Sequence, residues 1–202
     1  MEITLKEPSL FYLRLEQEAS QLLELCRQAG IPCKDLMDKP AKRQREWAAE
    51  RLLLCQAFGQ PVKLVHTEQG APMVDGSDVN VSISHTSRLV VLACDDLNVI
   101  GVDAEQADRV QVLRVRDKFL NAAEQEFIAP DDLAAHIIAW TAKEAVIKAT
   151  RDSAVDWTNG ICLEPFAIHP VKTTLVARCG AKCYRLTSQL IDDHYITVAA
   201  PM

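Results

Sequence analysis

The spacing of hydrophobic and polar positions divides the chain into helical and strand-like segments. Helices are predicted over residues 13–29, 40–58, 117–128 and 133–150, and Gly30 and Gly59 end the first two. Strands are predicted at residues 62–66, 79–84, 88–94, 99–105, 171–178, 183–188 and 194–199. The order is helices then strands, followed by a strand, helices and strands again. It predicts an α+β fold of two halves that meet near residue 98, rather than a parallel doubly wound sheet.

The composition of the 202 residues, 49% hydrophobic and 25% charged, is that of a soluble globular protein with one domain or two small ones. No apolar run is long enough to span a membrane, and residues 1–20 lack the pattern of a signal peptide, so we expect a cytoplasmic protein. A net charge of −6 argues against nucleic acid as the main partner. The cysteines are never spaced C-x-x-C, which favours reduced thiols over a zinc site, although Cys179 and Cys183 flank a turn and could approach each other.

The segment G-V-D-A-E (101–105) places two carboxylates on one face of a predicted strand. Alternate residues of a strand share a face, so Asp103 and Glu105 lie with Gly101, opposite Val102 and Ala104. Their spacing of ~7 Å allows both to supply oxygens to one hard cation, and Gly101 leaves room for a bulky group. The alternative is an acidic strand face that only prevents aggregation.

The segment W-T-A-K-E-A-V-I-K (140–148) places three chemically different side chains along one face of a predicted helix. Trp140, Glu144 and Lys148 are each about one turn apart and therefore stack in a row. The row presents an indole, a carboxylate and an ammonium group. The alternative is a Glu–Lys pair on a solvated face, with Trp140 in the core.

The segment V-S-I-S-H-T (81–86) ends a predicted strand, where strands pass into loops and functional residues often lie. Ser84 and His85 are adjacent and face opposite sides, so they make a poor nucleophile–base pair, and no G-x-S-x-G motif supports a hydrolase. His85 is interpreted either as a structural hydrogen-bonding residue or as a contact for a phosphate or ribose.

These motifs occur in the order S-I-S-H-T, V-I-G-V-D-A-E, F-L-N-A-A-E (119–124) and W-T-A-K-E-A-V-I-K-A. Together they resemble the 4′-phosphopantetheinyl transferase superfamily over residues 42–170, and the length and doubled layout resemble its two-lobed, surfactin-synthetase-activating type. The resemblance implies two pseudo-symmetric halves, each a small antiparallel sheet packed with helices. Residues 1–98 would supply most coenzyme A contacts and residues 99–202 the magnesium site and catalytic helix.

The implied reaction moves the 4′-phosphopantetheine arm of coenzyme A to a serine of an apo acyl or peptidyl carrier protein and releases 3′,5′-ADP. The resemblance implies a monomeric, Mg²⁺-dependent enzyme of fatty acid, polyketide or nonribosomal peptide biosynthesis. The magnesium-binding acids of the family match Asp103, Glu105 and Glu144. Glu144 also matches the general base, and Lys148 matches the lysine near the scissile phosphate. The nucleotide contacts match Ser84 and His85, and a further acid near the metal matches Glu124.

Physical chemistry independently favours these residue types for such a reaction. Cleavage of a pyrophosphate requires neutralisation of its charge, which a bridging cation provides. Mg²⁺ takes octahedral oxygen coordination from carboxylates, phosphates and water. A serine that attacks phosphorus must lose its proton, and a nearby carboxylate can accept it.

Two segments depart from the family pattern. G-A-P (70–72) stands where Gly-Lys-Pro is common, and T-R-D-S (150–153) stands where Gly-x-Gly is common. Ala71 thus replaces a lysine that contacts nucleotide phosphates, and we expect compensation from Arg43, Arg45 or Arg51. The loss also leaves open a catalytically weak binder of coenzyme A or carrier protein. A coenzyme A pyrophosphatase, which needs no carrier protein, is a further alternative.

A basic segment, R-V-Q-V-L-R-V-R-D-K (109–118), follows the two strand carboxylates closely. Its cations and interleaved apolar residues are typical of an interface with a basic rim, which suits an acidic carrier protein. The alternative is a solvated loop and helix start whose apolar residues pack inward.

Overall fold

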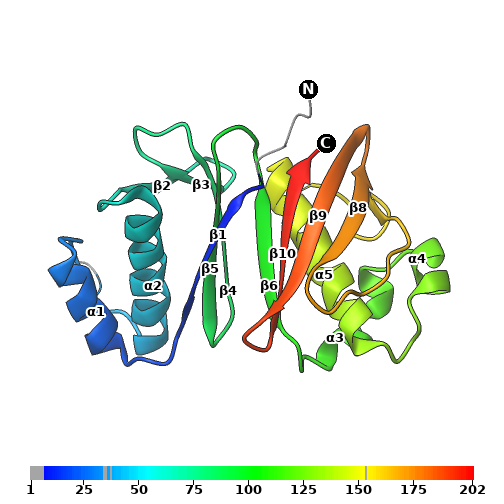
Figure 1. The fold of residues 1–202 in the computed structure, drawn as a ribbon, viewed down its shortest axis with the longest axis horizontal. Coiled ribbons are helices and arrows are strands. Elements are labelled where there is room, and N and C mark those ends of the chain that lie inside the picture. The colour runs from blue at the N-terminus through cyan, green and yellow to red at the C-terminus, as the bar shows by residue number, and fades with distance from the viewer. Residues whose placement is uncertain (1–6, 34–35, 37, 153) are drawn as a thin grey trace.

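A computed structural model gives the structure of the protein and describes residues 7–33, 36, 38–152 and 154–202. Two antiparallel five-stranded sheets lie side by side (Figure 1). The first has the order β1-β5-β4-β3-β2, with strands β1 (Ser9–Arg14), β2 (Leu64–His66), β3 (Pro72–Val74), β4 (Asn80–His85) and β5 (Leu89–Asp95). The second has the order β6-β10-β9-β8-β7, with strands β6 (Gly101–Gln106), β7 (Ile161–Leu163), β8 (Thr173–Cys179), β9 (Lys182–Ile191) and β10 (His194–Pro201).

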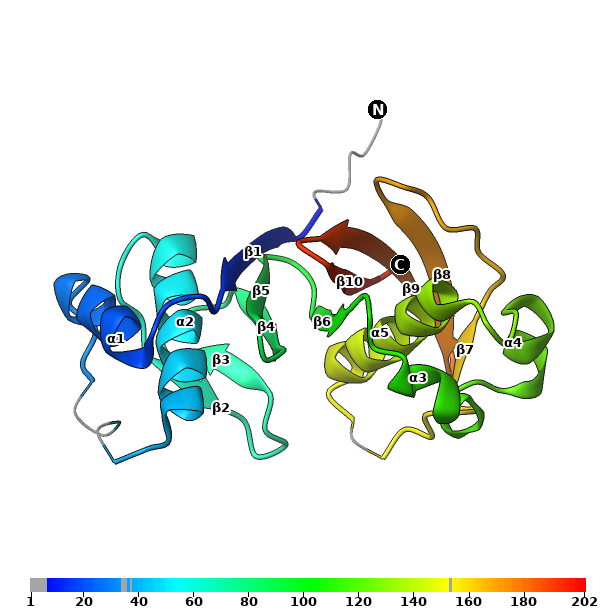
Figure 2. The same cartoon turned by 90° about the horizontal axis from the view of Figure 1, so that it is seen from below.

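Helices cover each sheet on one side (Figures 1 and 2). In the first half, α1 (Ala19–Gln28) packs on α2 (Ala41–Phe58), and α2 contacts β1 and β5. In the second half, α5 (Leu133–Thr150) contacts β6, β10 and α3 (Gln111–Arg114). The 3-10 turn η2 (Arg116–Lys118) and α4 (Ala122–Phe127) follow α3 along the chain. The prediction of an α+β fold with two antiparallel sheets and helices is therefore confirmed.

Most predicted elements form, and the errors have local causes. The helices predicted at 40–58 and 133–150 correspond to α2 and α5. The helix predicted at 13–29 begins too early, because residues 9–14 form β1 and pair with β5. The helix predicted at 117–128 is broken, since Asn121 is extended and its side chain caps α4. The three-residue strands β3 and β7 were not predicted.

The two halves meet along a hydrophobic seam. All seven residues of β5 are buried, and its alternate residues serve two cores. Val90, Leu92 and Cys94 join the core around α2, whereas Leu89, Val91 and Ala93 pack with residues of β6 and β10. A strand that is buried on both faces reads as a continuous apolar run, which explains the sequence L-V-V-L-A-C.

Gly101 lets α5 lie directly on β6. A Cβ atom at this position would lie 1.8 Å from the backbone oxygen of Ala145, far inside any real contact. The space beside Gly101 is therefore filled by α5 itself, and the expectation of room for another bulky group there is wrong. The close approach brings the face of β6 that carries Asp103 and Glu105 against the face of α5 that carries Glu144 and Lys148.

All seven cysteines are free thiols, so Cys179 and Cys183 form no disulfide in the structure. Within the described residues, no helix combines the length and the apolar character that a membrane span requires.

Candidate active site

Asp103 is the centre of the site and receives donors from both halves. Its side chain is buried, and its Oδ1 accepts a hydrogen bond from the Ser84 hydroxyl at 2.7 Å and from the Lys148 ammonium at 2.9 Å. Lys148 also donates to the backbone oxygen of Val102 at 2.8 Å. The other oxygen of Asp103, Oδ2, is buried and has no hydrogen-bond partner among the described residues. An orphaned buried carboxylate oxygen is costly, and it is the kind of atom that a cation would satisfy.

Ser84 therefore contacts a catalytic candidate from the opposite half, because β4 lies beside the edge strand β6. Its neighbour Ser82 makes a second tie across the seam, accepting a hydrogen bond from the backbone nitrogen of Val102 at 2.9 Å. These two hydrogen bonds fix the position of β4 along β6. Neither of these two contacts was predicted from the sequence.

Glu105 is paired with Arg109, whose guanidinium contacts its carboxylate. The Arg109 guanidinium also lies 4.7 Å from the centre of the Trp140 ring. Trp140 in turn packs edge-to-face on Phe119 and Trp157, with ring centres 5.3 and 4.4 Å apart. The indole at the start of the row on α5 thus supports the arginine that pairs with Glu105.

Burial and mutual repulsion disfavour the ionised forms of Glu105 and Glu144. Burial raises the pKa of Glu105 to about 6, with Arg109 opposing the shift and Asp103 and Glu144 adding to it. Burial also raises the pKa of Glu144, and the charge of Asp103 adds to that increase while Lys148 and Arg109 oppose it. The three acids are therefore close enough to repel one another, and Lys148 and Arg109 only partly offset them.

The donor set suits a hard cation that is completed by a ligand. Within the described part of the chain, no three acid, histidine or cysteine side chains are already gathered closely enough to chelate a metal by themselves. Mg²⁺ is commonly held by one or two carboxylates together with substrate phosphates and water. The free Oδ2 of Asp103 and the repulsion among Asp103, Glu105 and Glu144 fit such an ion.

The raised pKa of Glu105 predicts a stability cost in the metal-free protein. The folded state holds this proton up to about pH 6, whereas the unfolded chain releases it near its ordinary value of 4.5. The free energy of unfolding therefore falls as pH rises through this window. We expect Glu105→Gln to raise the free energy of unfolding at pH 7 by up to about 2 kcal/mol, and to have no such benefit at pH 4.

Urea unfolding in EDTA measures this effect at the two pH values. The exposed Glu126→Gln on α4 is the matched control, and we expect it to leave the free energy of unfolding unchanged. A Glu105→Gln protein that is less stable than the unaltered protein at pH 7 would contradict the expected sign.

A second polar cluster lies at the start of α2 and includes His85. The buried Glu46 carboxylate lies 3.6 Å from the Arg43 guanidinium, 3.8 Å from the Lys42 ammonium and 3.9 Å from Nδ1 of His85. The sequence analysis did not identify Glu46. Its signal was an acid three and four residues after two basic residues in a predicted helix.

The three arginines of α2 lie in different surroundings. Arg43 belongs to the Glu46 cluster, and Arg45 is half-buried and makes no ion pair within the described residues. Arg51 pairs with Glu50 at 3.0 Å and lies 4.9 Å from the centre of the Trp47 ring, and burial lowers its pKa. Arg51 is therefore not brought beside His85 in this structure.

Glu124 is tied to the far edge of the second sheet. It is fully buried, pairs with Lys143 at 2.7 Å, and accepts a hydrogen bond from the backbone nitrogen of Leu163 at 2.8 Å. Leu163 belongs to β7, at the opposite edge of the sheet from β6. Glu124 also completes the cap of α4 with Asn121. The expectation of a further acid near the metal is wrong, because both oxygens of Glu124 bind groups of the protein's own core.

A cavity of about 250 Å³ lies between the halves next to Lys148. One wall is formed by the turn before β3 and by β4, including Ala71 and Ser82, and the other by the end of α5 with Lys148 and Arg151. In Figure 2, β3 and β4 lie on one side of β6 and α5 on the other, and residues of β3, β4 and α5 line this cavity. We call it the cleft cavity.

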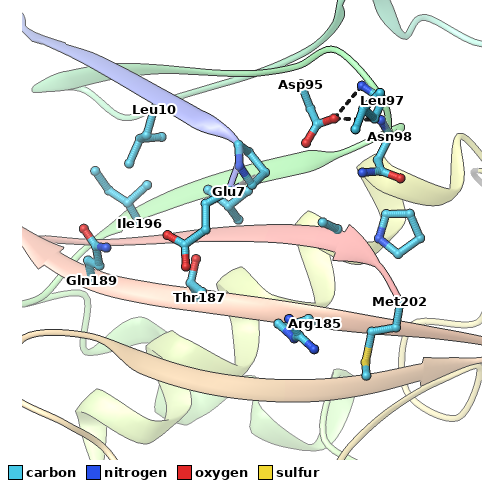
Figure 3. Close-up of a pocket in the computed structure, with 14 residues that line it drawn as sticks. Glu7, Leu10, Asp95, Leu97, Asn98, Arg185, Thr187, Gln189, Ile196 and Met202 are labelled. Atoms are coloured by element: carbon cyan, nitrogen blue, oxygen red, sulfur yellow. Dashed lines mark hydrogen bonds between the residues drawn. The ribbon is translucent and has the colours of Figure 1, made fainter. Parts of the chain in front are cut away.

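Another cavity, of about 220 Å³, lies at the seam near both termini. Figure 3 shows three residues around it: Leu10 of β1, Ile196 of β10, and Asn98 from the loop between β5 and β6. Arg185 and Met202 lie at its side. None of the three acids lines either cavity, but Lys148, which donates to Asp103, lines the cleft cavity and not this one. This contact associates the acid site with the cleft cavity.

The sequence model of the 4′-phosphopantetheinyl transferase superfamily matches residues 99–199. The match covers half of the chain, runs from β6 into β10, and includes the three acids and Lys148. The chain belongs to the 4′-phosphopantetheinyl transferase superfamily. Proteins of this superfamily transfer phosphopantetheine and use coenzyme A as substrate. No curated protein matches the chain significantly. In this phosphopantetheinyl transferase, the matched segment holds Asp103, Glu105 and Glu144 together with Lys148, which lines the cleft cavity.

Proposed function

We propose that the protein transfers the 4′-phosphopantetheine arm of coenzyme A to a serine of an apo acyl or peptidyl carrier protein, with Mg²⁺ as cofactor and 3′,5′-ADP as the released product. We further propose that it acts as a cytoplasmic monomer of the two-lobed type. The observation that carries this proposal is the convergence of Asp103, Glu105 and Glu144 beside Lys148, within the segment that matches the family.

Asp103, Glu105 and Glu144 would hold the Mg²⁺, which when bound would neutralise charge on the pyrophosphate of coenzyme A. Lys148 is already fixed by Val102 and Asp103, so its ammonium can offset phosphate charge without reorganisation. Ser84 holds the orientation of Asp103.

Glu144 is the candidate base for the carrier serine. Burial raises its pKa, so its ionised form is a stronger proton acceptor than an exposed glutamate. In the proposed step, the serine oxygen forms a bond to the phosphorus that carries pantetheine, and the bond from that phosphorus to the bridging oxygen breaks. The serine proton moves to Glu144, and the electron pair of the broken bond leaves with 3′,5′-ADP.

For the nucleotide we propose contacts from the first half. His85 and Arg43 share the Glu46 cluster, which orients two cationic or ionisable groups at the same end of α2. Arg45 and Arg51 remain candidates from the sequence, but the contacts of Arg51 with Trp47 and Glu50 favour Arg43 among the three.

The test is incubation with coenzyme A, Mg²⁺ and an apo carrier protein, followed by mass spectrometry of the carrier. The expected result is a carrier that gains one phosphopantetheine arm, and a carrier with its serine changed to alanine is the control. Binding of coenzyme A without transfer would favour a non-catalytic binder. Release of 3′,5′-ADP without any carrier would favour a pyrophosphatase.

The basic segment after β6 (residues 109–118) offers fewer exposed cations for docking than the sequence implies. Arg109 pairs with Glu105, and Arg116 donates to Gln125 at 3.0 Å with its side chain only 19% exposed. Arg114 and Lys118 remain exposed. We expect Arg114→Glu combined with Lys118→Glu to raise the KM for the carrier by roughly tenfold, because two attractive charges become repulsive.

Steady-state kinetics at several salt concentrations measure this change. The increase should grow as salt falls, and the KM for coenzyme A should stay constant. Lys182→Glu combined with Arg185→Glu, two exposed residues of β9, makes the same change in net charge elsewhere and serves as the control. An unchanged KM for the carrier at low salt would show that residues 109–118 do not bind the carrier and form only a solvated loop and helix start.

A further inference from the structure

Arg151 is a cation that lines the cleft cavity. It ends α5, and its guanidinium reaches across the cleft to donate to the side-chain oxygen of Asn80 at 3.1 Å. It makes no ion pair within the described residues. The nearby Asp152 uses its Oδ1 to accept a hydrogen bond from the backbone nitrogen of Ala154 at 2.9 Å. A neutral amide holds the Arg151 side chain in place and leaves its charge available.

The backbone of Arg151 adopts a conformation that this residue type disfavours. Its φ of 55° and ψ of 25° lie in the left-handed region, where a glycine or asparagine is the usual end of a helix. For other residues this conformation is strained, because Cβ lies too close to the following carbonyl oxygen. An arginine kept at such a position points to a use for its side chain.

The position of Arg151 relative to Lys148 suits two linked phosphates. Both line the cleft cavity, and Arg151 directly follows the end of α5, three residues after Lys148. Lys148 is the one bonded to Asp103, so Arg151 lies farther from the acids. A pyrophosphate that extends from the acids along this wall would meet Lys148 first and Arg151 next.

Among the described residues, the opposite wall of the cleft cavity has no charged side chain that could bind a phosphate. It consists of Gln69, Gly70, Ala71 and Pro72 with residues of β4. The two segments that depart from the family pattern, residues 70–72 and 150–153, therefore face each other across one cavity, although Ser153 lies outside the described residues. Arg151 therefore places a positive charge on one wall of the cleft cavity, opposite Ala71, where the family commonly has a lysine.

We infer that Arg151 binds the 5′-phosphate of the nucleotide part of the substrate, the phosphate next to the one that Lys148 serves. This inference rests on the proposed function and names a residue that determines substrate binding in the same site. Arg151 is a binding residue for the leaving group, and its charge takes the place of one absent at Ala71.

The experiment is calorimetric titration of the protein, in buffer that contains Mg²⁺, with 3′,5′-ADP and separately with adenosine 3′-phosphate. For Arg151→Gly we expect the Kd of 3′,5′-ADP to rise by about 10- to 100-fold, since a charge-assisted hydrogen bond is lost. Affinity for adenosine 3′-phosphate, which lacks the 5′-phosphate, should not change. Glycine fits the left-handed backbone, so the melting temperature should not fall.

Two further variants separate charge from structure. Asn80→Ala removes the tie across the cleft but keeps the cation, so the Kd of 3′,5′-ADP should change less than threefold. Ala71→Lys added to Arg151→Gly should restore much of the lost affinity from the opposite wall. Equal weakening of both nucleotides by Arg151→Gly, or no weakening of either, would overturn the inference. Failure of the unaltered protein to bind 3′,5′-ADP would overturn the proposed function as well.

Discussion

Asp103→Ala is expected to lower magnesium-dependent transfer by about 10³-fold, the size of effect seen when a preorganised charge at a reacting centre is lost. The substitution removes the buried oxygen that lacks a partner and the acceptor shared by Ser84 and Lys148. Lys148 keeps its bond to Val102, so the helix stays anchored to β6. The fold should persist, because the change also relieves the repulsion from Glu105 and Glu144.

Transfer to an apo carrier at increasing Mg²⁺ concentrations measures the loss, and circular dichroism checks the fold. Asp108→Ala is the matched control, since Asp108 follows β6 and is exposed. Ser84→Ala should show a much smaller loss, because it removes one hydrogen bond and leaves the carboxylate. Near-normal transfer by Asp103→Ala at saturating Mg²⁺ would show that this residue holds no catalytic metal.

Glu144→Gln is expected to lower kcat by at least ~10²-fold. Glutamine keeps the size of the side chain and the helix but cannot accept the serine proton. Burial raises the pKa of Glu144, so in the unaltered enzyme the active, ionised form is reached only above the usual range of a glutamate. The rate should therefore rise with pH through this raised pKa, and the glutamine variant should lose that part of the profile.

The pH dependence of kcat distinguishes a base from a group that only binds. Glu126→Gln on α4 again serves as the control, with kcat and its pH profile unchanged. If Glu144→Gln raises the KM for coenzyme A but preserves kcat and its pH dependence, then Glu144 is a binding residue and the base lies elsewhere.

The sequence predicts those parts of the fold that depend on local pattern. The segments 40–58 and 133–150 are long enough for helical periodicity to be clear, and both form helices near the predicted bounds. Residues 9–14 were merged into a helix, because their pairing partner in β5 lies about eighty residues away and leaves no local trace. The strands β3 and β7 have three residues each, too few to show a period of two.

The candidate site divides in the same way. Asp103 with Glu105, and Glu144 with Lys148, were identifiable because each pair has a fixed spacing within one element. The contacts that join elements were not predicted, including Ser84 with Asp103, Arg109 with Glu105 and His85 with Glu46. Arg151 was read only as a departure from a pattern, since its position opposite Ala71 exists only in the folded cleft.

The missing side chain at Gly101 limits how this protein can be altered. The backbone of Ala145 occupies the volume that any Cβ would take, and Ala145 directly follows Glu144 on α5. A methyl group there would push α5 away from β6 and carry Glu144 and Lys148 with it, while Asp103 stayed behind. Because α5 carries much of the buried core of the second half, the same displacement would also lower the free energy of unfolding. Libraries built from this scaffold should therefore keep this position fixed.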